Sequence, residues 1–161
     1  MSKQNVTITV GRTAVWTEVD KHTSYAGAKA GASLYDRVRA KSGDMATLER
    51  WWTDACGMVA TLLVPYATGI GFPTDGFSVV LSLPSNWNSA QKTVLTDAVK
   101  DIICDYILKQ WYELLGIDAQ AKTAAEKMTA GAAKVAAALY DRVRPTRPTY
   151  NLGHIGEKFP G

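Results

Sequence analysis

Residues 88–116, NSAQKTVLTDAVKDIICDYILKQWYELLG, carry the longest helical pattern in the chain. Asn88 and Gln91 have the three-residue spacing of a capping box, which marks a helix start. Gly116 marks the end, because glycine adopts the left-handed conformation common just after helices. Between these ends lies one broad apolar face, formed by Leu95, Ala98, Val99, Ile102, Ile103, Tyr106, Ile107, Trp111, Leu114 and Leu115. The pattern predicts a long helix with a large buried face.

A second helix is predicted directly after the first, from Asp118 to about Arg144, where Pro145 stops it. Small and apolar residues recur along it at alternating spacings of four and three, namely Ala121, Ala125, Met128, Ala132, Val135 and Leu139. Such a heptad seam indicates close packing against another helix. Because the connection at Gly116 is short, we expect antiparallel packing on the preceding helix. A seam between subunits is the alternative.

A third helix is predicted upstream, over residues 45–68. Its apolar side chains repeat at spacings of three and four, and Asp44 precedes them as a good N-cap. Pro65 is expected to kink or end this helix, because proline has no backbone N–H to donate. The following residues 69–76, GIGFPTDG, are typical of turns throughout.

The segment before that helix is harder to interpret. Residues 13–24 fit a helix with Thr13 as its N-cap, although part of the same stretch alternates as a strand would. Residues 25–43 are expected to form a loop or a frayed helix. Gly27 and Gly31 each cost a helix about 1 kcal/mol relative to alanine, and they also let another backbone approach closely.

Two segments alternate between apolar and polar residues, the pattern of strands with one buried face. They are residues 6–10 and 77–83, the latter ended by Pro84. Each is the natural partner of the other, which predicts a short antiparallel ribbon. Because a two-stranded ribbon is marginal alone and leaves an unpaired edge on each side, we expect it at a subunit boundary.

Two distant parts of the chain have similar sequences. Residues 28–39, AKAGASLYDRVR, match residues 133–144, AKVAAALYDRVR, at nine of twelve positions. A duplication would make both segments helical ends of the same structure. The similarity stops on both sides of the match, however, and no fixed period of repeats follows, which excludes a solenoid.

The C-terminal residues concentrate the formal charge of the chain. Residues 142–161 hold four basic side chains against one acidic one, and the other 141 residues are balanced, which accounts for the net charge of +3. Three prolines and three glycines exclude a regular helix there. We therefore expect an extended C-terminal arm, ordered by a partner, whose contact residues are Arg142, Arg144, Arg147, Tyr150 and Phe159. Contact with nucleic acid is the alternative, since arginine neutralises phosphates and Tyr150 could stack on a base.

Catalytic and metal-binding patterns are weak. Cys56 and Cys104 lie inside predicted helices and are expected to be free, buried thiols, while His22 and His154 are expected at the surface. Asp97, Asp101 and Asp105 form a stripe on one helix face, which is typical of a solvated face, of a dock for a basic arm, or of a divalent-cation site. We expect no enzymatic activity, no cofactor and no metal.

The expected fold is mainly α, with three or four helices in a bundle and a short antiparallel β-ribbon in residues 1–144, and the extended arm in residues 145–161. No apolar run approaches the roughly 20 residues needed to span a bilayer, and the N-terminus lacks the pattern of a signal peptide. We therefore expect a protein made in a cytosol, without contact to a membrane.

Five stretches, taken in order, resemble an uncharacterised family of neck or tail-region virion proteins from phages and prophages of gut Bacteroidetes. They are TITVGRTAVWTEV (7–19), TSYAGAK (23–29), YDRVRAKSGDMATLERWW (35–52), FSVVLSLPSNW (77–87) and LYDRVRPTRP (139–148). Such proteins are similar to the small subunits of tailed-phage necks, which form rings between portal and tail and use extended termini to grip neighbours. The resemblance supplies no active-site residues.

This resemblance implies a structural subunit of a tailed-phage virion, a ring-forming head-to-tail connector or a tail-completion protein, assembled in the host cytoplasm. Its implied partners are further copies of the chain and the portal or tail proteins, with DNA only passing through the lumen of the ring. The alternative from another class is a small cytosolic DNA-binding regulator that uses the basic arm.

Overall fold

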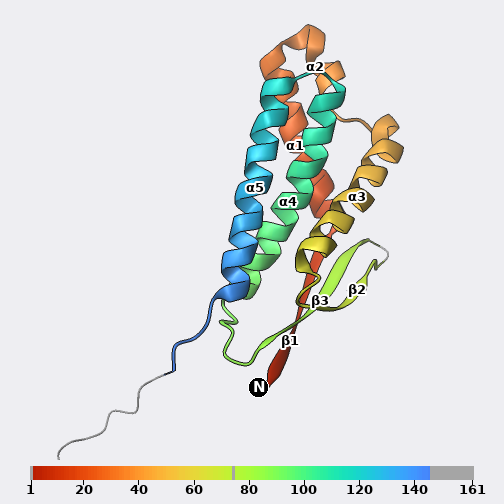
Figure 1. Ribbon diagram of the computed structural model, residues 1–161. Helices are drawn as coiled ribbons and strands as arrows, with labels where there is room; N and C mark the ends of the chain where they lie inside the picture. Colours follow the sequence, from red (N-terminus) through yellow and green to blue (C-terminus); the bar gives the residue numbers. More distant parts are fainter. Residues whose placement is uncertain (1, 74, 146–161) are drawn as a thin grey trace, which may run out of the picture.

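The computed structural model describes residues 2–73 and 75–145, with the backbone alone at residues 32–34. The element order is β1 (Lys3–Gly11), α1 (Arg12–Ala30), α2 (Ala32–Val38), a 3-10 turn (Ser42–Asp44), α3 (Met45–Leu63), β2 (Ala67–Gly71), β3 (Gly76–Pro84), α4 (Gln91–Leu114) and α5 (Asp118–Tyr140). Four long helices stand side by side, and the small sheet lies at one end of them (Figure 1). The expected mainly α fold with a small antiparallel sheet is confirmed.

The sheet has three strands, in the order β1-β3-β2, with both pairings antiparallel. The predicted pairing of the two alternating segments is correct, with Val6 opposite Leu81. The prediction of only two strands was wrong, because residues 67–71 form a third strand on the other side of β3. Strand β3 is therefore central and paired on both sides, so the subunit boundary that we expected at the ribbon cannot run along β3 and stays a prediction for the edge of β1 that is free among the described residues.

Helix α3 ends at Leu63, five residues before the predicted end at residue 68. Pro65 explains the early stop, since it cannot donate the next helical hydrogen bond. The chain then turns toward the sheet, where the Ser82 amide donates to the Tyr66 carbonyl at 2.7 Å. Asp44 precedes α3 as predicted, but its carboxylate accepts the Lys41 amide at 2.8 Å and so closes the 3-10 turn instead.

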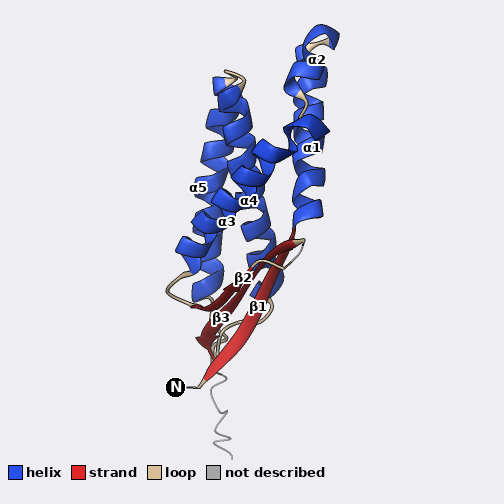
Figure 2. Ribbon diagram, turned by 90° about the vertical axis from the view of Figure 1, so that its right-hand side faces the viewer, coloured by secondary structure: helices blue, strands red, loops and turns tan. Residues whose placement is uncertain are grey.

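Helix α1 follows β1 without a loop (Figure 2), since Gly11 is both the last residue of the strand and the N-cap of the helix. The helix begins at Arg12, so the predicted cap at Thr13 was wrong. The interpretation of residues 25–43 as a loop or frayed helix was also wrong, because α1 continues to Ala30 and α2 follows. The two glycines explain the difference. A Cβ at Gly27 would lie 3.0 Å from the Tyr35 ring, and Gly31 breaks the helix with φ of +100°.

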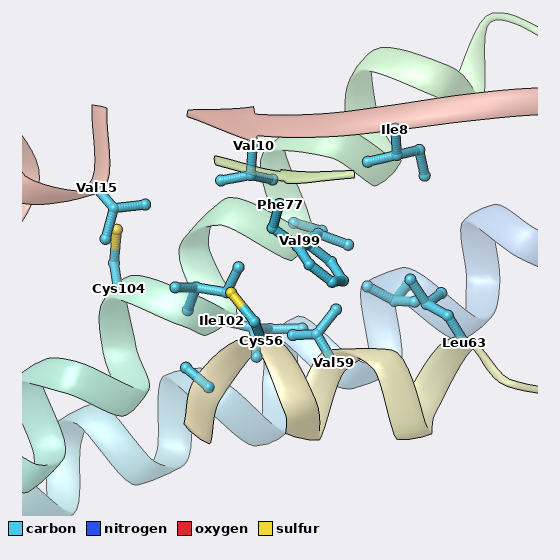
Figure 3. Close-up of a cluster of buried hydrophobic side chains, with 14 of the residues drawn as sticks. Ile8, Val10, Val15, Cys56, Val59, Leu63, Phe77, Val99, Ile102 and Cys104 are labelled. Carbon is cyan, nitrogen blue, oxygen red and sulfur yellow. The ribbon is translucent and has the colours of Figure 1, made fainter. Parts of the chain in front are cut away.

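Helix α4 is the central helix, buried on most sides by α1, α3, α5 and the sheet. Figure 3 shows the meeting point of sheet and helices, where Ile8 and Phe77 of the sheet and Val59 and Val99 of the helices belong to one core cluster. The antiparallel packing of α5 on α4 is confirmed, and Gly116 joins them with φ of +71°. The predicted seam is only half right, since α5 buries Ala121, Ala124, Gly131, Val135, Ala138 and Leu139.

Candidate functional site

The C-terminal end of α5 is anchored to the loop that precedes α4. The Trp87 indole donates from Nε1 to the Ala138 carbonyl at 2.8 Å, and Trp87 forms an antiparallel bridge with Arg142. The Val143 amide donates to the Asn86 carbonyl at 2.8 Å. Helix α5 therefore ends at Tyr140, four residues before the predicted end, because the chain beyond it pairs with this loop rather than with its own previous turn.

Asp141 closes the anchor with its side chain. Its carboxylate accepts hydrogen bonds from Asn88 Nδ2 at 2.9 Å and from Gln91 Nε2 at 2.7 Å. These two bonds lower the pKa of Asp141. The predicted capping box at the start of α4 was wrong, since the Gln91 side chain donates to Asp141 and the Asn88 Oδ1 accepts from the backbone amide of Ala90, at 3.1 Å, rather than from that of Gln91. We call these contacts between residues 86–91 and 138–143 the exit clamp.

Two of the five predicted contact residues lie in the described part of the chain. Arg142 is partly buried and donates from Nη1 to the carbonyls of Leu139 and Asp141, at 2.6 and 3.0 Å. It therefore stabilises the clamp, which the sequence did not indicate. Arg144 is exposed. Arg147, Tyr150 and Phe159 lie outside the described residues, as does His154, and so does all of the predicted arm except Pro145.

The stripe of three aspartates borders a cavity of about 370 Å³ between α1, α4 and α5. Asp101 and Asp105 line it, together with Glu18, His22, Lys127 and Lys134. Asp97 is not among the lining residues and is exposed. The cavity is therefore a groove of mixed charge rather than an acidic face, because lysines of α5 stand among the acids of α1 and α4.

Asp105 is the most perturbed acid of this groove. Burial raises its pKa to about 6, although Lys127 lowers the value and Asp101 raises it further. His22 forms a 3.8 Å ion pair with Glu18 on the same helix when it is protonated, and its side chain is about half exposed. Within residues 2–73 and 75–145 there is no group of three or more His, Cys, Asp or Glu side chains that could hold a metal ion.

Neither cysteine is arranged for chemistry. Cys56 and Cys104 are buried and free, as predicted. Burial raises the pKa of both thiols to about 12, so almost no thiolate, the reactive form, is present near neutral pH. The core positions of Cys56 and Cys104 are visible among apolar side chains in Figure 3.

A second cavity, of about 200 Å³, opens between α3 and α5 over α4. We call it the apolar groove, because six of its seven lining residues are apolar. They are Met58, Val59 and Leu62 of α3, Ile102 of α4, and Met128 and Ala132 of α5, with Thr129 as the polar exception. The Thr129 hydroxyl already donates to the Ala125 carbonyl at 3.2 Å.

The apolar groove also explains the predicted heptad seam on α5. Ala125, Met128 and Ala132 belong to the seam by spacing, yet they are only partly buried. They lie on the side of α5 nearest α3, where the two helices do not close on each other. The sequence predicted an apolar stripe on α5. The spacing of the residues alone could not show which of them pack against α4 and which line the apolar groove.

Sheet edges are the last feature that could take a partner. Among the described residues, β1 and β2 each pair with β3 alone, so each has one edge without a neighbouring strand. The β1 edge runs for nine residues without a proline or a bulge. The β2 edge is shorter, rich in glycine and interrupted by a bulge near Gly69, which makes it the poorer template for strand addition.

Comparisons with protein-family models, with curated proteins and with solved structures found no match for this chain. None of the helices in the described part of the chain is both long enough and apolar enough to cross a membrane.

Proposed function

We propose that the protein is a structural subunit of a tailed-phage virion, which forms a closed homo-oligomeric ring as a head-to-tail connector or a tail-completion protein. The observation that carries the proposal is the exit clamp. It directs residues 141–145 away from the helices, at the end of the molecule where the sheet lies (Figure 1). The resemblance to neck-region virion proteins supports the same reading.

The direction of exit favours contact with another copy. Two backbone hydrogen bonds, from Val143 to Asn86 and from Asn88 to Asp141, tie the segment to a loop of the fold itself. Pro145 biases the preceding Arg144 toward extended backbone, which continues the same direction. A segment that leaves one surface and grips a different surface of the next copy makes a heterologous contact, and such contacts close into a ring when the rotation between successive copies closes.

The chemistry of the described residues agrees with a structural role. The thiols are shielded by the core, and the 370 Å³ groove is lined by charges of both signs. In this proposal, portal or tail proteins bind the two faces of the ring, and DNA passes through the lumen without being read. The protein is assembled in the host cytoplasm and resides in the virion.

The alternative, a DNA-binding regulator that uses the arm, has less support. Arg142 donates to two backbone carbonyls, so this guanidinium is partly committed within the fold. The number of phosphates that the segment could neutralise is correspondingly smaller, and the net charge of the whole chain is only +3.

Two measurements test the proposal. Mass photometry of the full chain should give a particle several times the 17.4 kDa of one copy, and negative-stain images should show rings. A chain cut after Pro145 should fold, by circular dichroism, and stay monomeric. DNA affinity measured from about 50 to 200 mM salt distinguishes the ring subunit from the DNA-binding regulator. For a regulator, counterion release predicts that the affinity falls steeply as the salt concentration rises. A monomeric full chain with salt-sensitive DNA binding would overturn the proposal.

A further inference from the structure

We infer that the apolar groove between α3 and α5 is the docking site for the aromatic side chain of Phe159 from a second copy of this chain. The inference rests on the proposed function, since it names the surface that the arm of one subunit grips on the next.

The size of the groove selects the kind of group that fills it. At about 200 Å³ it is below the range of roughly 300–1,000 Å³ that is usual for small-molecule sites. An apolar cavity of about 150 Å³ is enough to hold a benzene molecule. A single aromatic ring therefore fits the groove, and one inserted ring surrounded by apolar contacts is the common form of an interface anchor.

The lining selects an apolar ring over a polar one. Met58 and Met128, two of the four methionines in the chain, border the groove from α3 and α5. Thioether groups adapt their shape and make favourable contacts with aromatic rings. The Thr129 hydroxyl is the one polar group among the described lining side chains, and its hydrogen is already donated to the Ala125 carbonyl. A purely apolar ring such as that of phenylalanine therefore matches most of the lining.

The groove is open to an incoming side chain. Leu62 on its rim is 41% exposed, and Met128 and Ala132 are only partly covered. The exposed apolar surface is small, which suits one inserted side chain rather than a broad interface. Its position, on the flank of the bundle away from the mixed-charge groove, keeps it free of charged lining residues.

The reach of the chain allows the contact. Phe159 follows Pro145 by fourteen residues, which span at most about 50 Å when extended. The groove residues Met128 and Ala132 lie eight to twelve residues before the end of α5, or roughly 12–18 Å along the helix. Length alone therefore permits either the same copy or a neighbour.

The exit clamp decides in favour of a neighbour. It directs residues 141–145 away from the helices (Figure 1), whereas the groove is lined by Met128 and Ala132, further back along α5. To fill its own groove, the chain would have to reverse direction after Pro145 and run back beside the helix it has left. A neighbour's groove can be reached by continuing outward, and that contact is heterologous, as a ring requires.

A pair of matched substitutions tests the inference on the full-length chain. Ala132→Glu places a charge in the groove, while Ala133→Glu makes the same change at the next residue, which is exposed and borders neither groove. We expect Ala132→Glu and Phe159→Ala each to raise the Kd of self-association about tenfold or more, and Ala133→Glu to leave it unchanged. Circular dichroism should show equal helix content in all three variants.

A disulfide experiment shows whether the Phe159 side chain in the groove comes from the same copy or from a neighbouring copy. Leu62→Cys and Lys158→Cys are made in separate chains, which are mixed in equal amounts and oxidised gently. Native Cys56 and Cys104 are buried and do not compete. We expect a covalent dimer in the mixture. A link that forms only in the double variant, at the mass of one chain, would overturn docking by a neighbour.

Failure of this inference can be told apart from failure of the proposed function. A full-length chain that stays monomeric at all concentrations overturns the ring proposal itself. A chain that assembles, but whose Kd responds to Ala132→Glu and Phe159→Ala no more than to Ala133→Glu, overturns the groove inference alone and leaves the ring standing.

Discussion

Gly131 of α5 lies directly against Ile102 of α4, so closely that a Cβ at position 131 would stand 2.7 Å from the Ile102 Cγ1 atom. This is the tightest approach between the two helices among the glycines of the described chain. It shows why a poor helix former sits in the middle of a long helix, since the packing gained there outweighs the propensity lost.

Replacing Gly131 with alanine is therefore expected to destabilise the protein. Overpacking costs roughly 1–3 kcal/mol, against a gain of about 1 kcal/mol in helix propensity. The control is Gly57→Ala in α3, where an added Cβ meets nothing within 4 Å and should stabilise by about 0.5–1 kcal/mol. Urea unfolding measures the change in unfolding free energy of both variants. An equal gain in stability would show that Ile102 and α4 can move to accommodate the added Cβ.

Replacing Asp105 with asparagine is expected to stabilise the protein at pH 7. Its folded-state pKa, about 6, lies above the ordinary 3.8, so the favourable contribution of the protonated carboxyl is complete below about pH 3.8 and lost as pH rises past 6. Discounted for partial exposure, the gain at pH 7 should be roughly 1–2 kcal/mol and should vanish near pH 4. Unfolding at both pH values, with exposed Asp97→Asn as control, measures it.

Asp141 should show the opposite pH dependence. Its pKa is lowered by hydrogen bonds from Gln91 and Asn88, so its contribution to stability is present above the ordinary carboxyl pKa and is lost as pH falls through the lowered value. Gln91→Ala should move the pKa of Asp141 upward. NMR titration of the carboxyl carbon measures this, and Lys92→Ala, which removes no bond to Asp141, should leave the pKa where it was.

Proline at position 80 should prevent folding rather than only assembly. Val80 lies in the central strand, opposite Thr7 of β1 and Gly69 of β2. A proline there removes a ladder hydrogen bond that no change of partner can restore. We expect Val80→Pro to lose near-UV circular dichroism, with Val80→Thr as the tolerated control. A folded, monomeric Val80→Pro protein would instead place β3 at a subunit boundary.

One hexapeptide shows how far the sequence could predict the fold. LYDRVR occurs at residues 34–39 and again at 139–144. The first copy is helical through Val38, whereas in the second the helix ends at Tyr140 and Asp141 is extended. Identical local propensities therefore gave two structures, and the difference lies in Asn88 and Gln91, which hold the second aspartate from far along the chain.

The other differences between prediction and structure also come from contacts between residues far apart in the sequence. The helices α4 and α5 and their antiparallel packing could be predicted, because long periodic patterns outweigh local exceptions. The strand at residues 67–71 could not, since its glycines carry no strand pattern and only pairing with β3 makes it one. The predicted heptad seam on α5 contains two residues of the apolar groove, Met128 and Ala132. That these residues line a groove depends on the distance between α3 and α5, which the sequence of α5 does not determine.

The exit clamp also has a mechanical consequence. A pull on the C-terminal segment meets the hydrogen bonds of Val143 and Asn88 to the opposite backbone before it reaches the last turn of α5. Tension borne at the clamp is passed to the loop before α4 and from there to the central strand β3, rather than unwinding the helix from its end. Force spectroscopy on the C-terminus should therefore record one abrupt rupture, and Trp87→Ala should turn it into a gradual extension.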